Sequence, residues 1–96
     1  MKADEIRKGM VVWIACEVRV GPFPDERKVF VPSASGDWFG FVNVSELDKK
    51  VLNGPDRVRA VVLGVESNGV LLGINGQSPA SKGVTAKPSL IEHAAL

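Results

Sequence analysis

The stretch that decides the fold is Gly-Asp-Trp-Phe-Gly-Phe-Val-Asn-Val-Ser-Glu-Leu, residues 36–47. It holds three of the six aromatic residues of the chain, and its alternation predicts a β-strand over residues 38–44. Successive side chains of a strand point to opposite faces. The two valines are therefore expected in the core, and the outward-facing side chains are Phe39, Phe41 and Asn43.

The end of this stretch predicts a short helix. Ser45 is a typical N-cap residue, and Asp48 three positions later completes a weak capping box. The Asn-Gly-Pro sequence at residues 53–55 is a clear stop signal. We therefore expect about two helical turns between this strand and the next.

Apolar alternation predicts four further strands. Every even-numbered residue from Met10 to Val20 is apolar, so this face should point to the core, with Cys16 as a small buried hydrophobe. The four strands are expected at residues 10–20, 28–32, 57–67 and 70–75.

The last two of these strands should form a hairpin. Asn68-Gly69 is typical of a two-residue type I′ turn, in which both central residues have positive φ. That turn would pair Val65 with Leu72 and would place Leu63 on the same inner face. The apolar character of this face supports the register.

Composition indicates one soluble domain. The 96 residues are 45% hydrophobic and 24% charged, with a net charge of +1, which is not the basic excess of most nucleic-acid-binding domains. One cysteine excludes an internal disulfide and a cysteine zinc site. We divide the chain into a polar lead-in (1–9), a β-barrel domain (10–75), and a linker with a short tail helix opened by Ser89 (76–96).

The N-terminal residues lack the apolar segment of a signal peptide. No apolar run approaches the roughly 18 residues that a membrane helix needs. The sequence therefore predicts a cytoplasmic protein without a membrane partner.

Five strands with a helix between the third and fourth predict an all-β fold, a small antiparallel barrel of the OB type. Residues 40–47, Gly-Phe-Val-Asn-Val-Ser-Glu-Leu, resemble the Gly-hydrophobic-Val-His-Ile-Ser-Glu-Leu pattern of S1 RNA-binding domains, a branch of that fold. Weaker similarity covers residues 8–12, 30–31 and 58–66. An OB arrangement implies that the first strand pairs with both the second and the fourth.

A second resemblance is to SH3-like barrels. Asp37-Trp38 followed by residues 40–42 is similar to the later strands of that family, with residues 21–28 as its long first loop. SH3-like domains bind extended peptides through aromatic grooves. The hairpin at residues 57–74 would then be an addition to the barrel.

The candidate ligand surface is aromatic. Phe30, Phe39 and Phe41 are expected on one outer face, and a base stacked on such a ring contributes about 1–3 kcal/mol. The alternative is that the tail or a second subunit covers this face, because burying a Phe contributes roughly 1.5–3 kcal/mol.

Four further residues complete the candidate site. Trp13 lies opposite the core face of the first strand, where it would either join the stacking surface or fill a second small core. Arg57 and Arg59 share one parity and would either contact phosphates or protect a solvated edge strand. The resemblance implies a ligand contact at Asn43, where S1 domains have an RNA-contacting His.

The sequence offers little for catalysis. Its single histidine, His93, lies near the C-terminus, and it has no glycine-rich phosphate loop or metal-ligand cluster. We therefore predict a binding module, not an enzyme, with no cofactor, metal or catalytic residue. Its predicted partner is single-stranded RNA or DNA, and the alternative is a protein-protein interaction or homo-oligomerisation module.

Overall fold

The computed structural model describes residues 1–34, 36–78 and 83–94, and these form an all-β fold without an α-helix. Three one-turn 3₁₀ helices are η1 (Ala3–Glu5), η2 (Val44–Glu46) and η3 (Pro88–Leu90). The strands are β1 (Val11–Val20), β2 (Glu26–Val31), β3 (Trp38–Asn43), β4 (Gly54–Glu66), β5 (Gly69–Ile74), β6 (Val84–Ala86) and β7 (Ile91–His93).

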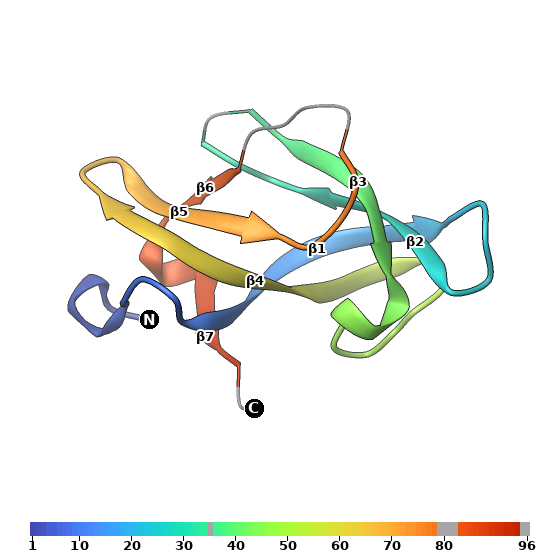
Figure 1. Cartoon of the computed structure of the whole chain (residues 1–96), viewed down its shortest axis with the longest axis horizontal. Coiled ribbons are helices and arrows are strands. Elements are labelled where there is room, and N and C mark those ends of the chain that lie inside the picture. Colours follow the sequence, from blue (N-terminus) through green and yellow to red (C-terminus); the bar gives the residue numbers. More distant parts are fainter. Residues whose placement is uncertain (35, 79–82, 95–96) are drawn as a thin grey trace.

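The strands form one antiparallel sheet in the order β3-β2-β1-β4-β5-β6, with β7 also paired to β1 (Figure 1). The long β1 is the central element. Residues 11–18 pair with β4 along one edge, and residues 17–20 pair with β2 along the other. β1 therefore pairs with both β2 and β4.

The sheet curls into a nearly closed barrel, and the segment after β5 fills the seam. Phe41 and Gln77 exchange two backbone hydrogen bonds of 2.8 and 2.9 Å. Further along, β6 pairs with β5 and its Thr85 carbonyl accepts the N–H of Ala34 at 3.0 Å. These contacts join β3 to Gln77, and they join the β2–β3 turn to β5 through β6.

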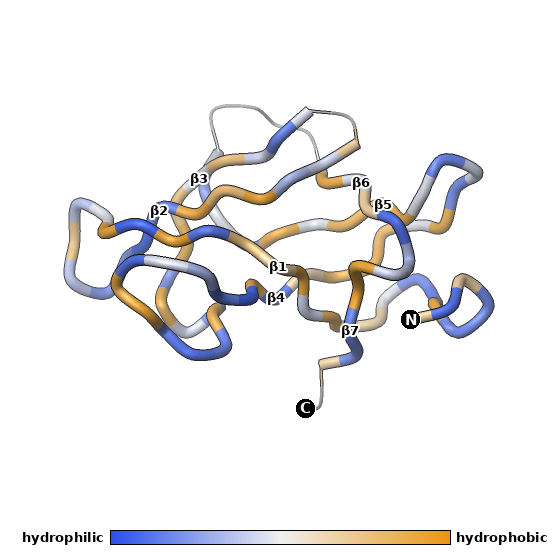
Figure 2. The backbone as a smooth tube through the Cα atoms, turned by 180° about the vertical axis from the view of Figure 1, so that it is seen from behind, coloured by the Kyte–Doolittle hydropathy of each residue, from blue (hydrophilic) through white to orange (hydrophobic). Residues whose placement is uncertain are grey.

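The predicted alternation of β1 is confirmed over residues 12–18, because Val12, Ile14, Cys16 and Val18 are all buried, whereas Val20 at the end of the strand is 55% exposed. Hydrophobic and hydrophilic bands alternate along the strands in Figure 2. Leu47 and Val58, which form an isolated bridge, close the core at one end. The fully buried side chains are mostly valines, as the narrow interior of a small barrel requires.

The prediction of a two-turn helix after Ser45 is wrong. The chain makes only the single turn η2 there. Its N-cap is Asn43 and not Ser45, since Asn43 Oδ1 accepts the N–H of Ser45 at 2.9 Å. The carboxylate of Asp56 then accepts the N–H groups of Lys49 and Val51. These side-chain bonds replace the bonds that a helix would make, so the segment remains a loop.

The predicted hairpin register is also wrong. Glu66 pairs with Gly69 and Val65 with Val70, and a bulge interrupts the ladder between Val62 and Gly64. The turn is therefore one residue earlier than expected, and the bulge changes which side chains face inward. Leu63 and Val65 of β4, which were predicted to face the core, are instead 47% and 48% exposed.

The described part of the chain has seven strands, so the predicted count of five is wrong. The expected tail helix is absent there, because η3 leads into β7 and the Ile91 side chain is fully buried. The N-terminal ammonium group donates to the carbonyls of Pro88 and Ile91, which joins the two ends of the chain. Residues 79–82 of the expected linker and 95–96 of the tail lie outside the described residues. Among the described residues, no helix is long and apolar enough to cross a membrane.

Candidate functional site

Two phenylalanines form an aromatic pair on the outer face of β2 and β3. Phe30 and Phe39 are directly opposite in the strand register, with ring centroids 6.2 Å apart and an interplanar angle of 23°. Their exposed fractions are 37% and 41%. The Nζ atom of Lys28 lies 5.3 Å from the Phe30 centroid and 5.7 Å from the Phe39 centroid. A cation therefore stands beside two accessible rings.

The other two predicted residues of β3 have structural roles. Phe41 is the next outward residue after Phe39 and lies opposite Lys28, but it is half-buried beside the barrel seam. Asn43 is exposed, and its Oδ1 atom caps η2. The amide group of Asn43 is therefore already engaged through its oxygen.

A second group forms around Trp13, which is half-buried on β1 and opposite Arg59 on β4. The guanidinium carbons of Arg57 and Arg59 lie 5.8 and 5.2 Å from the indole centroid. The indole is therefore flanked by two cations of the same strand, which is a cation–π arrangement. The sequence suggested that Trp13 would either fill a second small core or join a stacking surface, and its contacts with the two arginines differ from both.

The protein's own acids match the charges of these arginines. Arg57 forms ion pairs with Asp48, at 2.7 Å, and with Glu92. The hydrogen bond to Asp48 raises the pKa of Arg57 above its ordinary value, and Glu92 adds to the effect. Arg59 lies 3.8 Å from Glu46. These two arginines therefore offer less positive charge to a phosphate than the sequence suggests.

The two groups lie on the same outer face of the sheet but remain separate. Trp13 is four residues before Glu17 on β1, and Glu17 is the residue that pairs with Phe30. Glu17 therefore lies between the aromatic pair and the Trp13 group, and its carboxylate forms an ion pair of 2.6 Å with Arg19. No carboxylate lies within ion-pair distance of Lys28 in the part of the chain that the structure describes.

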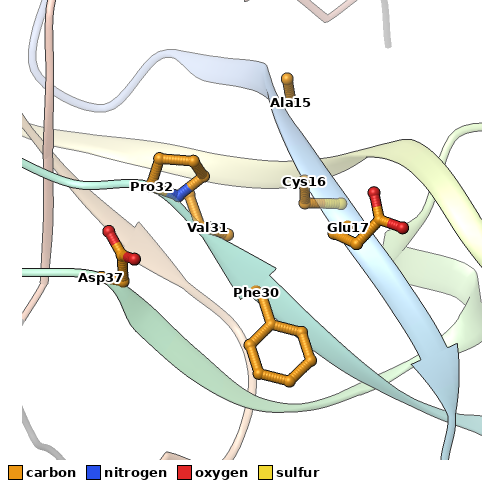
Figure 3. Close-up of a pocket in the computed structure, with 7 residues that line it drawn as sticks. All are labelled: Ala15, Cys16, Glu17, Phe30, Val31, Pro32 and Asp37. Carbon is orange, nitrogen blue, oxygen red and sulfur yellow. The ribbon is translucent and has the colours of Figure 1, made fainter.

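A pocket of about 300 Å³ opens beside the aromatic pair, between β1, the end of β2 and the β2–β3 turn (Figure 3). Sequence reasoning missed it. Its one sequence signal is Pro32, which ends the second strand early. The lining residues are Ala15, Cys16, Glu17, Phe30, Val31, Pro32 and Asp37.

The one thiol that lines the pocket is buried and protonated. Burial raises the pKa of the Cys16 thiol to about 12, and the nearby charges of Asp56 and Glu17 add to the effect. At neutral pH this sulfur is protonated and is a poor nucleophile. Among the described residues, no three His, Cys, Asp or Glu side chains form a group that could hold a metal ion.

The fold and this face define the chain as a small, nearly closed antiparallel β-barrel with an exposed aromatic pair. None of the family models, curated proteins and solved structures with which the chain was compared matches it.

Proposed function

We propose that the chain is a non-catalytic binding module of the OB type that takes single-stranded RNA or DNA on the outer face of β2 and β3. Two observations support the OB assignment over the SH3-like one. β1 pairs with both β2 and β4, and residues 40–47 resemble the S1 pattern. The outer face of strands two and three is where OB barrels bind oligonucleotides. A cytoplasmic location remains a prediction.

The observation that carries the proposal is the exposed aromatic pair with Lys28 above it. Each ring can stack one base, and base stacking tolerates any sequence because every base has a π-face. The Lys28 ammonium can contact a neighbouring phosphate. Since Arg57 and Arg59 are ion-paired, few phosphates are neutralised, and we expect log Kd to rise with log salt with a shallow slope of about one.

A fluorescence-anisotropy titration tests the proposal, with labelled mixed-sequence single-stranded RNA and DNA at about 50 mM salt, where phosphate contacts are strongest. Phe39→Ala should weaken binding about five- to hundredfold, the equivalent of one stacked base. Phe23→Ala is the matched control, because Phe23 is 61% exposed in the loop after β1. Absence of binding at micromolar protein, or an equal loss in both variants, would overturn the proposal.

A protein-interaction or homo-oligomerisation module is the second candidate. It is favoured by an apolar row on the outer face of β4, where Val61, Leu63 and Val65 are 40%, 47% and 48% exposed. Contiguous exposed apolar side chains often mark interfaces. Sedimentation velocity over a wide concentration range would show association of the wild-type chain that Leu63→Asp abolishes. A strictly monomeric wild-type chain would rule out self-association.

A further inference from the structure

One edge of β1 is interrupted. Along this edge residues 12–14 pair with β7 and residues 17–20 pair with β2. Ala15 and Cys16 fall between the two partners. On the opposite edge the ladder to β4 continues without a break, with Ala15 opposite Arg57. β1 therefore has a gap of two residues on one side only.

The backbone of Ala15 points into this gap. In an antiparallel ladder, alternate residues direct their N–H and C=O groups to the same edge. The Val11 carbonyl accepts the N–H of Ala94, so odd-numbered residues of β1 face β7 and β2. The Met10 carbonyl accepts the N–H of Val62 on β4, so even-numbered residues face the other way. Ala15 is odd, and it therefore presents one donor and one acceptor to the gap.

The sequence keeps both neighbours from closing the gap. Since Glu17 pairs with Phe30, an extension of β2 would place Pro32 opposite Ala15, and proline has no N–H to donate. Since Ile14 pairs with Ile91, an extension of β7 would place Leu90 there. The N–H of Leu90 already donates to the Lys87 carbonyl at 3.0 Å within η3.

The gap opens onto the pocket beside the aromatic pair (Figure 3). Phe30 and Pro32 supply apolar walls, and the carboxylates of Glu17 and Asp37 also line the pocket. Each carboxylate already has one partner, since Glu17 Oε1 holds Arg19 at 2.6 Å and Asp37 Oδ1 accepts the N–H of Ser33 at 3.4 Å. A second pocket of about 440 Å³, towards β6 and η3, shares Pro32 and Asp37 with the first. A ligand in the first pocket would thus meet a ring wall, a backbone donor–acceptor pair and two acceptor side chains.

We propose that this pocket takes one nucleobase that carries an exocyclic amino group: adenine, cytosine or guanine. This inference rests on the proposed function, since Phe30 belongs to both surfaces. Every base offers a neighbouring donor and acceptor on its pairing edge, which suits the backbone of Ala15. The carboxylates of Asp37 and Glu17 select among bases, because carboxylates accept hydrogen bonds from amino groups.

Uracil and thymine lack that amino group and present two carbonyl oxygens, which the carboxylates repel. An added peptide strand is a poorer occupant. The gap extends only from Ile14 to Glu17, which is roughly 10 Å of strand, and β7 and β2 occupy both flanks. A single planar ring fits between these flanks, and a strand of several residues does not.

The first test compares four ten-nucleotide oligo-dT probes whose central position is dT, dA, dC or dG. The three amino-bearing probes should bind at least about fivefold more tightly than all-dT, the discrimination of one good base contact. In the double variant Glu17→Gln, Asp37→Asn the preference should disappear while all-dT binding persists. Phe39→Ala should weaken all four probes alike.

The outcomes separate the two proposals. Equal binding of the four probes, with loss in Phe39→Ala, would overturn the base pocket and leave the binding module intact. No binding to any probe would overturn both. A preference that survives the double variant would also overturn the assignment, because the two carboxylates would then not be the selecting groups.

Amide hydrogen exchange tests the backbone contact in the same samples. In the free protein the Ala15 amide should exchange faster than those of Trp13 and Glu17, which share its edge but are paired. The dC-bearing probe should slow exchange at Ala15 more than the all-dT probe does. An Ala15 amide that is as protected as its neighbours in the free protein would overturn the gap itself.

Discussion

At the scale of single residues, Asp56 organises the segment in which a helix was expected. Its carboxylate accepts the backbone N–H groups of Lys49, Val51 and Arg57 at 2.9, 3.2 and 2.7 Å. Burial alone would raise the pKa of Asp56, but these backbone donors outweigh burial and hold the pKa below its ordinary value. The ionised carboxylate is therefore the form that stabilises the fold.

This arrangement predicts an acid-sensitive contribution from Asp56. Because its folded pKa is lowered, the contribution is complete above the unfolded value of about 3.9 and is lost as pH falls through the folded pKa. At neutral pH, Asp56→Ala should lower the free energy of unfolding by about 1–3 kcal/mol, since partly buried N–H groups lose their acceptor. Urea unfolding at neutral and acidic pH measures both effects, with the exposed Asp4→Ala as control. An Asp56→Ala variant that matches this control would contradict the assigned role.

At the scale of elements, the C-terminal strand β7 is part of the barrel. Ile91 pairs with Ile14 and is fully buried, whereas its neighbour Leu90 is 55% exposed. Ile91→Ala should therefore lower the free energy of unfolding by about 2–5 kcal/mol, the usual effect of truncating a core aliphatic side chain. Leu90→Ala, measured by the same urea titration, should have little effect. Similar values for the two variants would show that β7 is not docked.

Alternation predicted the five strands of six or more residues, although not the register of the β4–β5 hairpin, and it missed the three-residue strands β6 and β7. β1 has ten residues and one buried face, so the alternation of apolar residues repeats several times along it. β7 has three residues, which are too few to show a period, and Ser89 before it predicted the start of a helix instead. Burial of Ile91 against the sheet outweighs that local preference. Tertiary packing, which sequence pattern does not contain, decides such short elements.

The candidate site divides in the same way. The exposure of Phe30 and Phe39 followed from strand parity alone. The matched charges of Arg57 and Arg59 did not, because their partners Glu46 and Glu92 are far away in the sequence. The gap at Ala15 could not be predicted from the sequence either, because it is defined only when the registers of β7 and of β2 on β1 are both known.

At the scale of the whole molecule, the barrel closes only because two glycines leave room at the seam. A Cβ atom on Gly40 would lie 2.4 Å from the Gln77 carbonyl oxygen, and one on Gly76 would lie 2.6 Å from that of Phe41. Both oxygens belong to the pair of backbone hydrogen bonds that joins β3 to the segment after β5. Any side chain at these positions would push the two segments apart.

We therefore expect Gly40→Ala to open the seam. The added methyl group should lower the free energy of unfolding by about 1–3 kcal/mol, as overpacking does, and should speed amide exchange at Phe41 and Gln77. Gly64→Ala is the matched control: a Cβ there meets nothing within 4 Å, so the same change in a strand should be neutral or stabilising by up to about 1 kcal/mol. If Gly40→Ala keeps the exchange protection of Phe41 and Gln77, the seam does not hold the barrel closed. If protection falls there and remains in β1 and β4, closure is a local event, and the face that carries Phe30 and Phe39 is free to flex relative to the rest of the barrel.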